Sequence, residues 1–381
     1  MSRQLKITFM IMMTVALAFG FFHHLIPKEQ LNFERLHIFL FNLCSGGTLL
    51  LYYTEDRKNL SKTARTFFVL SICFALFSFL EWYLPTLVIP LVLGVLVERI
   101  RITHFGSVFP RSLFSTAEDV ARKFHQAALL CLSLALFISS FVILNEVYGN
   151  WFYLEKLRLD TFFLGFSFPV SLISMSVIFS LMKKHEVEIT IHIKEALFWT
   201  INLGVIIFFL FILARWFVPQ VMIATTLFLA VTMVLYLYYH QGIRLQQKSF
   251  LTSGILFLLI TSITGIIYIL YAFSADYDPQ QTQPLLRLHA FTALYGWNLS
   301  GLAVISRHGD FPIRLHSQKV IVLHWLTVLF LCPLGYFIPW AALAAVVSYA
   351  FLLQTLLFNS GPADSRLVTI EDEVLAATKE K

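Results

Sequence analysis

Long apolar runs separated by short polar segments dominate the chain, and most of them have the roughly 20 residues that a helix needs to cross a bilayer. A backbone inside lipid must satisfy its hydrogen bonds internally, so such runs predict helices. The pattern predicts an all-α fold, a polytopic membrane protein with about twelve transmembrane helices. We expect a transmembrane helical domain over residues 1–360 and a cytoplasmic tail over 361–381, with spans near 6–26, 35–53, 65–82, 84–98, 124–145, 159–182, 195–214, 218–240, 250–273, 287–306, 319–336 and 338–358.

The composition supports a membrane protein rather than a soluble globule. Hydrophobic residues make up 58% of the chain and charged residues 13%, whereas a typical soluble domain carries about 25% charge. The formal net charge is +6, but the basic residues are spread through the loops without an aromatic and basic recognition pattern. The lipid bilayer is therefore the expected partner, and nucleic acid is not.

The distribution of positive charge predicts the orientation. With the N-terminus inside, all but six of the 28 Lys and Arg residues fall on the cytoplasmic side, and the exceptions are Lys28, Arg35, Lys156, Arg158, Arg215 and Arg287. Cytoplasmic loops of membrane proteins carry this excess of Lys and Arg. The sequence therefore predicts a multi-pass protein of the inner membrane with both termini in the cytoplasm. The first apolar run continues through Phe22, which favours an uncleaved span over a signal peptide.

One short string opens three of the spans that begin on the outer side. It reads R-L-H-I-F at 35–39, R-L-D-T-F at 158–162 and R-L-H-A-F at 287–291. The third residues of these strings, His37, Asp160 and His289, are 123 and 129 residues apart. A fixed period indicates repeated structural units, here three arcs of four helices around an approximate threefold axis. The alternative is coincidence, because Arg and Leu are common where helices meet the interface.

The faces below these three residues carry small or weakly polar side chains at helical spacing. Examples are Cys44 and Thr48 below His37, the serines of 167–174 below Asp160, and Ala293 and Gly296 below His289. Such stripes let helices approach closely, or they leave a slot for a flat ligand. Ionisable groups inside spans are costly and tend to face the interior.

Histidine is a frequent axial ligand of haem iron, so the pair His37 and His289 predicts a haem b site. The alternative for each histidine is a hydrogen-bonding role at the membrane interface. Two imidazoles on one iron need ring nitrogens about 4 Å apart, since metal–imidazole bonds are about 2 Å long. Arg35 and Arg287 lie two residues outward and are expected to meet the haem propionates. The other histidines, His324 among them, receive no ligand role from their spacing, and no soluble-type catalytic motif is present.

Twelve helices in three arcs, with histidines near the outer ends of helices two and ten, resemble subunit I of the haem-copper oxidase and nitric oxide reductase superfamily. The stretch L-H-A-F-T-A-L-Y-G-W-N at 288–298 is similar to Gly-Trp-containing helices of divergent relatives. The resemblance implies that His37 and His289 bind a low-spin haem. The sequence departs from the family at the copper ligands, because Asp160 replaces a histidine and 195–214 lacks a His-His pair. An oxygen-reducing centre is not expected.

Three functions follow as hypotheses. The first is a b-type haem protein that transfers electrons or responds to redox or nitrogen-oxide stress, with other respiratory-chain subunits as candidate partners and no reaction assigned. The second is a transporter with a polar path along Asn42, Asn202, Asn298 and the serines of span six, because repeated units also suit transporters. The third is a non-catalytic assembly or scaffold subunit of a respiratory complex.

Overall fold

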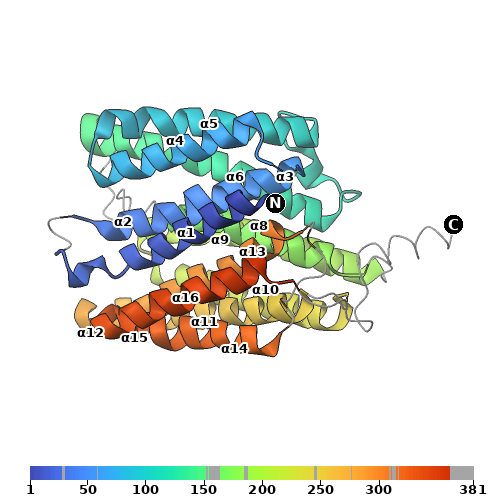
Figure 1. Ribbon diagram of the computed structural model, residues 1–381. Coiled ribbons are helices and arrows are strands. Elements are labelled where there is room, and N and C mark those ends of the chain that lie inside the picture. Colours follow the sequence, from blue (N-terminus) through green and yellow to red (C-terminus); the bar gives the residue numbers. More distant parts are fainter. Residues whose placement is uncertain are drawn as a thin grey trace.

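The computed structural model is a bundle of helices that lie roughly side by side (Figure 1). It describes residues 1–27, 31–57, 59–151, 153, 164–183, 188–243, 247–275, 277–308, 310, 315 and 317–360. Within this part of the chain every named element is a helix. The prediction of an all-helical fold is therefore confirmed there, whereas Asp160, Arg158 and the tail 361–381 lie outside the described residues.

The first half of the bundle contains the helices up to α8. In chain order they are α1 (Arg3–Phe19), η1 (Phe22–His24), α2 (Phe33–Ile38), η2 (Phe39–Gly47), α3 (Thr48–Glu55), α4 (Lys62–Phe79), α5 (Tyr83–Phe105), η3 (Arg111–Phe114), α6 (Val120–Ile143), η4 (Leu144–Gly149), η5 (Leu164–Phe166) and α8 (Ser167–Ser180).

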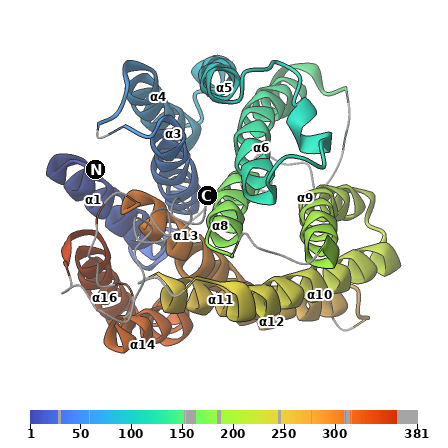
Figure 2. The ribbon, with the colours of Figure 1, turned by 90° about the vertical axis from the view of Figure 1, so that its right-hand side faces the viewer.

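The second half begins with two long helices on the outside of the bundle (Figure 2). Its elements are α9 (Glu188–Ala214), α10 (Phe217–Gln241), α11 (Lys248–Ala272), α12 (Pro279–Phe291), η6 (Thr292–Asn298), α13 (Leu299–Ser306), α14 (Gln318–Leu326), η7 (Thr327–Leu331), α15 (Cys332–Phe337) and α16 (Pro339–Phe358).

Nine helices in the described residues are long and apolar enough to cross a membrane. The remaining expected spans coincide with α1, with α8 and with the continuous helix from α12 to α13. Large apolar side chains such as Leu84, Leu210 and Phe351 are exposed on the outside of the bundle. This surface is consistent with a polytopic helical membrane protein, since lipid is as apolar as these side chains.

In the part of the chain that the structure describes, four apolar helices contain a π-helical segment, namely η2, η4, η6 and η7. A π turn inserts an extra residue into an α-helix and often marks a functional site. Two of them lie at the R-L-H-x-F strings: η2 begins at Phe39, the last residue of its string, and η6 begins at Thr292, the residue after its string. The two described strings thus share this feature, although η4 and η7 lie in helices without the string.

The helices of spans two, six and ten meet in the middle of the bundle, where α3, α8 and α13 lie inside the other helices (Figure 2). The Asn298 side chain donates to the Ser167 carbonyl at 3.3 Å, and the Trp297 indole donates to the Ser171 hydroxyl at 2.7 Å. Gly301 packs against Ser174 so closely that a Cβ would overlap it. Small residues on these faces therefore serve close helix packing here, as one of the two interpretations of the stripes expected.

Candidate functional site

His37 lies on α2 and packs against α1. Its Nδ1 donates to the main-chain carbonyl of Ala16 at 2.9 Å. The ring also lies against Gly20, where a Cβ atom would come within 2.9 Å of Nδ1. Only 6% of the residue is exposed. The glycine therefore provides the space in which the imidazole fits.

His289 lies on α12 and packs against α11 in the same manner. Its Nδ1 donates to the main-chain carbonyl of Thr261 at 2.9 Å. The ring lies against Gly265, where a Cβ atom would come within 3.1 Å of the ring carbon Cε1. Each histidine is thus anchored to the segment that precedes its own helix. In both cases the ring bonds to a carbonyl and packs on the glycine four residues later.

This anchoring determines the chemistry that each ring can offer. A carbonyl oxygen only accepts hydrogen bonds, so Nδ1 carries the proton and the neutral Nε2 keeps its lone pair. Neither Nε2 has a hydrogen bond to a described residue. Metal-ligating histidines have this arrangement, because the carbonyl fixes the ring and raises the basicity of the free nitrogen. The two rings are suited to binding a metal or accepting a proton.

The surroundings of the two rings differ. The Tyr295 hydroxyl lies 2.9 Å from Nδ1 of His37 and is a second acceptor for its proton. The Tyr295 ring packs on Phe41 and Tyr349, with centroids 4.8 and 5.0 Å away. At His289 the second contact is the Thr264 hydroxyl, at 3.3 Å. An aromatic cluster therefore encloses His37 and has no equivalent among the described contacts of His289.

Tyr295 also links this cluster to His324, which the sequence did not single out. The His324 Nε2 donates to the Tyr295 carbonyl at 2.6 Å, a group that belongs to the π-helix η6. The other nitrogen of His324, Nδ1, and the hydroxyl of Tyr349 are buried without a hydrogen-bond partner among the described residues. Polar groups that stay unpaired in the interior of a protein are costly and call for an explanation.

Arg35 and Arg287, the expected propionate partners, already have partners within the protein. Arg35 donates to the Ser78 carbonyl at 2.6 Å and lies 3.4 Å from Glu81. Arg287 pairs with Glu34 and lies over the Tyr336 ring at 4.2 Å. The Arg287 Nε is buried without a partner in the described part of the chain, so this guanidinium retains one donor for another group.

The structure does not bring the two imidazoles into contact with each other. The nearest ring to His37 is that of Tyr295, with centroids 5.5 Å apart. Among the described residues no group of three or more His, Cys, Asp or Glu side chains is placed to hold a metal ion. The donor chemistry of two anchored imidazoles fits a haem iron, whereas joint ligation by both rings stays a prediction.

The two histidines that follow the C-terminal end of α1 have a structural explanation. His23 and His24 each bond through Nε2 to a main-chain carbonyl at 2.8 Å, those of Tyr336 and Gly335. His23, Gly20, Glu34 and Arg287 line a small cavity of about 70 Å³. The adjacent pair thus joins α1 to α15 through its hydrogen bonds.

A scan against protein-family models, a search of curated proteins and a search of solved structures each returned no match.

Proposed function

We propose that this chain is a b-type haem protein of the inner membrane with oxidase subunit I-like architecture, in which His37 and His289 bind the haem. The observation that carries the proposal is the shared anchoring of these two rings, each with Nδ1 on a carbonyl, a glycine beneath the ring and Nε2 without a hydrogen bond to a described residue. Haem iron supplies one-electron chemistry when bound. The role is electron transfer or a response to redox or nitrogen-oxide stress, in association with other respiratory-chain subunits.

The residues of this chain would orient the ligands and close the site. Ala16 and Thr261 fix the two rings, and the buried aromatic cluster keeps water away from His37. The unpaired Nε of Arg287 is a donor for a propionate near the outer end. Three arcs of four helices, with α3, α8 and α13 inside, are part of the same proposal.

An absorption spectrum of the purified protein tests the proposal. We expect a low-spin b-type band in the reduced-minus-oxidised spectrum, and His37→Ala and His289→Ala should each abolish it, because each removes one of the two imidazoles that would hold the haem. His125→Ala is the matched control: this buried histidine bonds to Thr54 in the last turn of α3 and should leave the band unchanged. Wild-type protein without any haem band would exclude the proposal.

A polar path is the second candidate, and a specific set of atoms favours it. Asn42 Nδ2, Asn298 Oδ1 and Thr48 Oγ1 are buried without partners among the described residues where the three central helices meet. Asn202 belongs to a different contact, since it lies beside Cys131 between α6 and α9. If this path carries a substrate, Asn298→Leu should stop uptake into proteoliposomes, while a haem band would stay unchanged.

The orientation can be tested separately. Both termini and the loops near 54–64 and 99–123 are proposed to face the cytoplasm, because the excess of Lys and Arg lies there. A cysteine placed at Asn59 should resist an impermeant thiol reagent in intact cells and react after permeabilisation. The native cysteines Cys44 and Cys332 are buried and Cys73 and Cys131 are partly buried, so a cysteine-free background is the control. Labelling in intact cells would overturn the orientation.

A further inference from the structure

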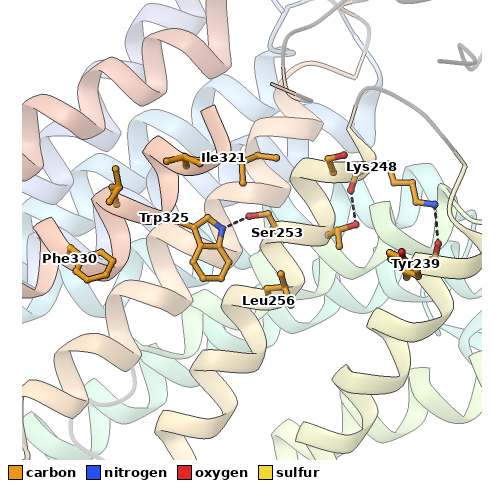
Figure 3. A pocket seen from close by; sticks show the side chains of 11 residues that line it. Tyr239, Lys248, Ser253, Leu256, Ile321, Trp325 and Phe330 are labelled. Carbon is orange, nitrogen blue, oxygen red and sulfur yellow. Dashed lines mark hydrogen bonds between the residues drawn. The ribbon is translucent and has the colours of Figure 1, made fainter. Parts of the chain in front are cut away.

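An open groove runs along the outside of the bundle between α10, α11 and α14 (Figure 3). Its volume is about 590 Å³. Much of its lining consists of apolar side chains that face away from the core, among them Leu256, Val322, Leu326 and Phe330. A second hollow of about 380 Å³ shares Val322 and Leu326 with it. The two hollows form one groove that follows α14.

Two lysines lie at the same end of this groove. Lys248 is in the first turn of α11, and its ammonium group donates to the carbonyls of Tyr239 and Gly242 at 3.1 and 2.8 Å. Lys319 is in the first turn of α14, is exposed and lines the second hollow. This is the end of the bundle that the charge distribution predicts to be cytoplasmic. The groove is therefore cationic at the membrane surface and apolar toward the middle of the bilayer.

The length of the groove matches one leaflet. From Lys319 to Phe330, α14 and η7 rise about 16 Å at 1.5 Å per residue, and half of the hydrocarbon core is about 15 Å thick. Two hydrogen bonds lie on the floor: the Trp325 indole donates to Ser253 at 2.6 Å, and the Thr252 hydroxyl donates to the Lys248 carbonyl at 2.8 Å. An occupant thus meets charge at one end and apolar surface along the rest.

We propose that this groove binds an anionic phospholipid of the cytoplasmic leaflet, with its phosphate headgroup at Lys319, attracted also by the positive charge of Lys248, and an acyl chain along Trp325 and Phe330. Basic pockets between helices on the cytoplasmic side bind anionic headgroups, and this groove adds a matching apolar length. A quinone fits less well, because it carries no charge to match the two lysines at one end of the groove. Lipid binding in this groove does not depend on haem binding.

The test uses the full chain reconstituted in vesicles with equal amounts of phosphatidylglycerol and phosphatidylcholine, then extracted in mild detergent and analysed for retained lipid. Wild-type protein should retain phosphatidylglycerol preferentially. Lys248→Ala and Lys319→Ala should each lower that preference about fivefold, the effect of one basic residue near an anionic surface. Lys62→Ala is the matched control, since Lys62 begins α4 at the same end of the bundle and is exposed.

A variant that fills the groove distinguishes binding of the lipid headgroup from binding of its acyl chain. Val322→Trp should reduce retention of phosphatidylglycerol severalfold while the protein stays monodisperse on size exclusion, because Val322 is exposed and does not support the core. Equal phosphatidylglycerol retention by the Lys248→Ala/Lys319→Ala double variant and by Lys62→Ala would overturn the proposal. Displacement of the lipid by inorganic phosphate alone, or retention of a quinone in its place, would also overturn it.

Discussion

The α1–α2 and α11–α12 hairpins present the same histidine in two different environments. In both, the imidazole donates through Nδ1 to a carbonyl at 2.9 Å and lies on a glycine four residues further along the preceding helix. His37 is enclosed by the ring and hydroxyl of Tyr295. His289 is less enclosed, and among the described residues its second contact is the Thr264 hydroxyl.

This difference distinguishes the contacts that each helix pair provides to its histidine from the contacts that the rest of the bundle adds. The carbonyl and the glycine belong to a neighbouring segment within each hairpin, so each hairpin supplies its own. The second acceptor is a side chain from elsewhere in the fold at His37 and from the same hairpin at His289. The anchor is therefore common to the two hairpins, whereas the environment of each ring is specific to its position.

Removal of the Tyr295 side chain should have the largest effect on stability and should remove most of the difference between the two histidine sites. Tyr295→Ala deletes a fully buried ring, and truncation of a large buried aromatic side chain costs roughly 3–5 kcal/mol of stability. We expect a lower unfolding temperature in detergent and a His37 site as open as that of His289. Leu210→Ala is the control, because this side chain is exposed on α9. An unchanged unfolding temperature would show that Tyr295 does not support the cluster.

Substitution of the glycines beneath the two rings should change the unfolding temperature by different amounts at the two sites, and by less than Tyr295→Ala does. An alanine Cβ at position 20 would lie 2.9 Å from His37 Nδ1, whereas at position 265 its nearest contact with His289 would be 3.1 Å. Overpacking costs about 1–3 kcal/mol, and replacing a helical glycine by alanine returns up to about 1 kcal/mol. Gly20→Ala should therefore lower the unfolding temperature, and Gly265→Ala should leave it nearly unchanged.

Gly165 provides a control for these two glycines. An added Cβ at this position would have no atom of the described residues within 4 Å, so Gly165→Ala reports the effect of the substitution without a clash. If Gly20→Ala and Gly265→Ala change the unfolding temperature equally, the two rings are held with the same tightness and the contrast between the sites is wrong.

The apolar pattern predicted most helices but not where they end. The span expected at 195–214 begins earlier, at Glu188, and the one expected at 84–98 continues to Phe105. Hydropathy marks where a helix enters lipid, whereas the helix itself continues until a residue stops it, as Gly106 does with a φ of +74°. Membrane boundaries and helix boundaries are therefore different quantities.

The site was predictable only through its repeated string. R-L-H-x-F pointed to His37 and His289, but the groups that anchor them are main-chain carbonyls, which carry no sequence signal. The role of Gly20 and Gly265 as the surfaces on which the two rings pack can be recognised only once the helix pairs are known. Tyr295 and His324 were missed because aromatic and histidine side chains in an apolar run do not show which neighbours they will meet.

The smallest expected effects concern the second acceptors of the two Nδ1 protons. Tyr295→Phe removes a hydroxyl at 2.9 Å from His37 and keeps the ring, and Thr264→Val removes one at 3.3 Å from His289. A net hydrogen bond contributes about 0.5–1.5 kcal/mol, and long ones contribute less. Tyr295→Phe should therefore lower the unfolding temperature by a few degrees and Thr264→Val by less. Because the Ala16 and Thr261 carbonyls remain, both variants should keep their histidines in place, and a larger effect at Thr264 would show that His289 relies on its side-chain partner.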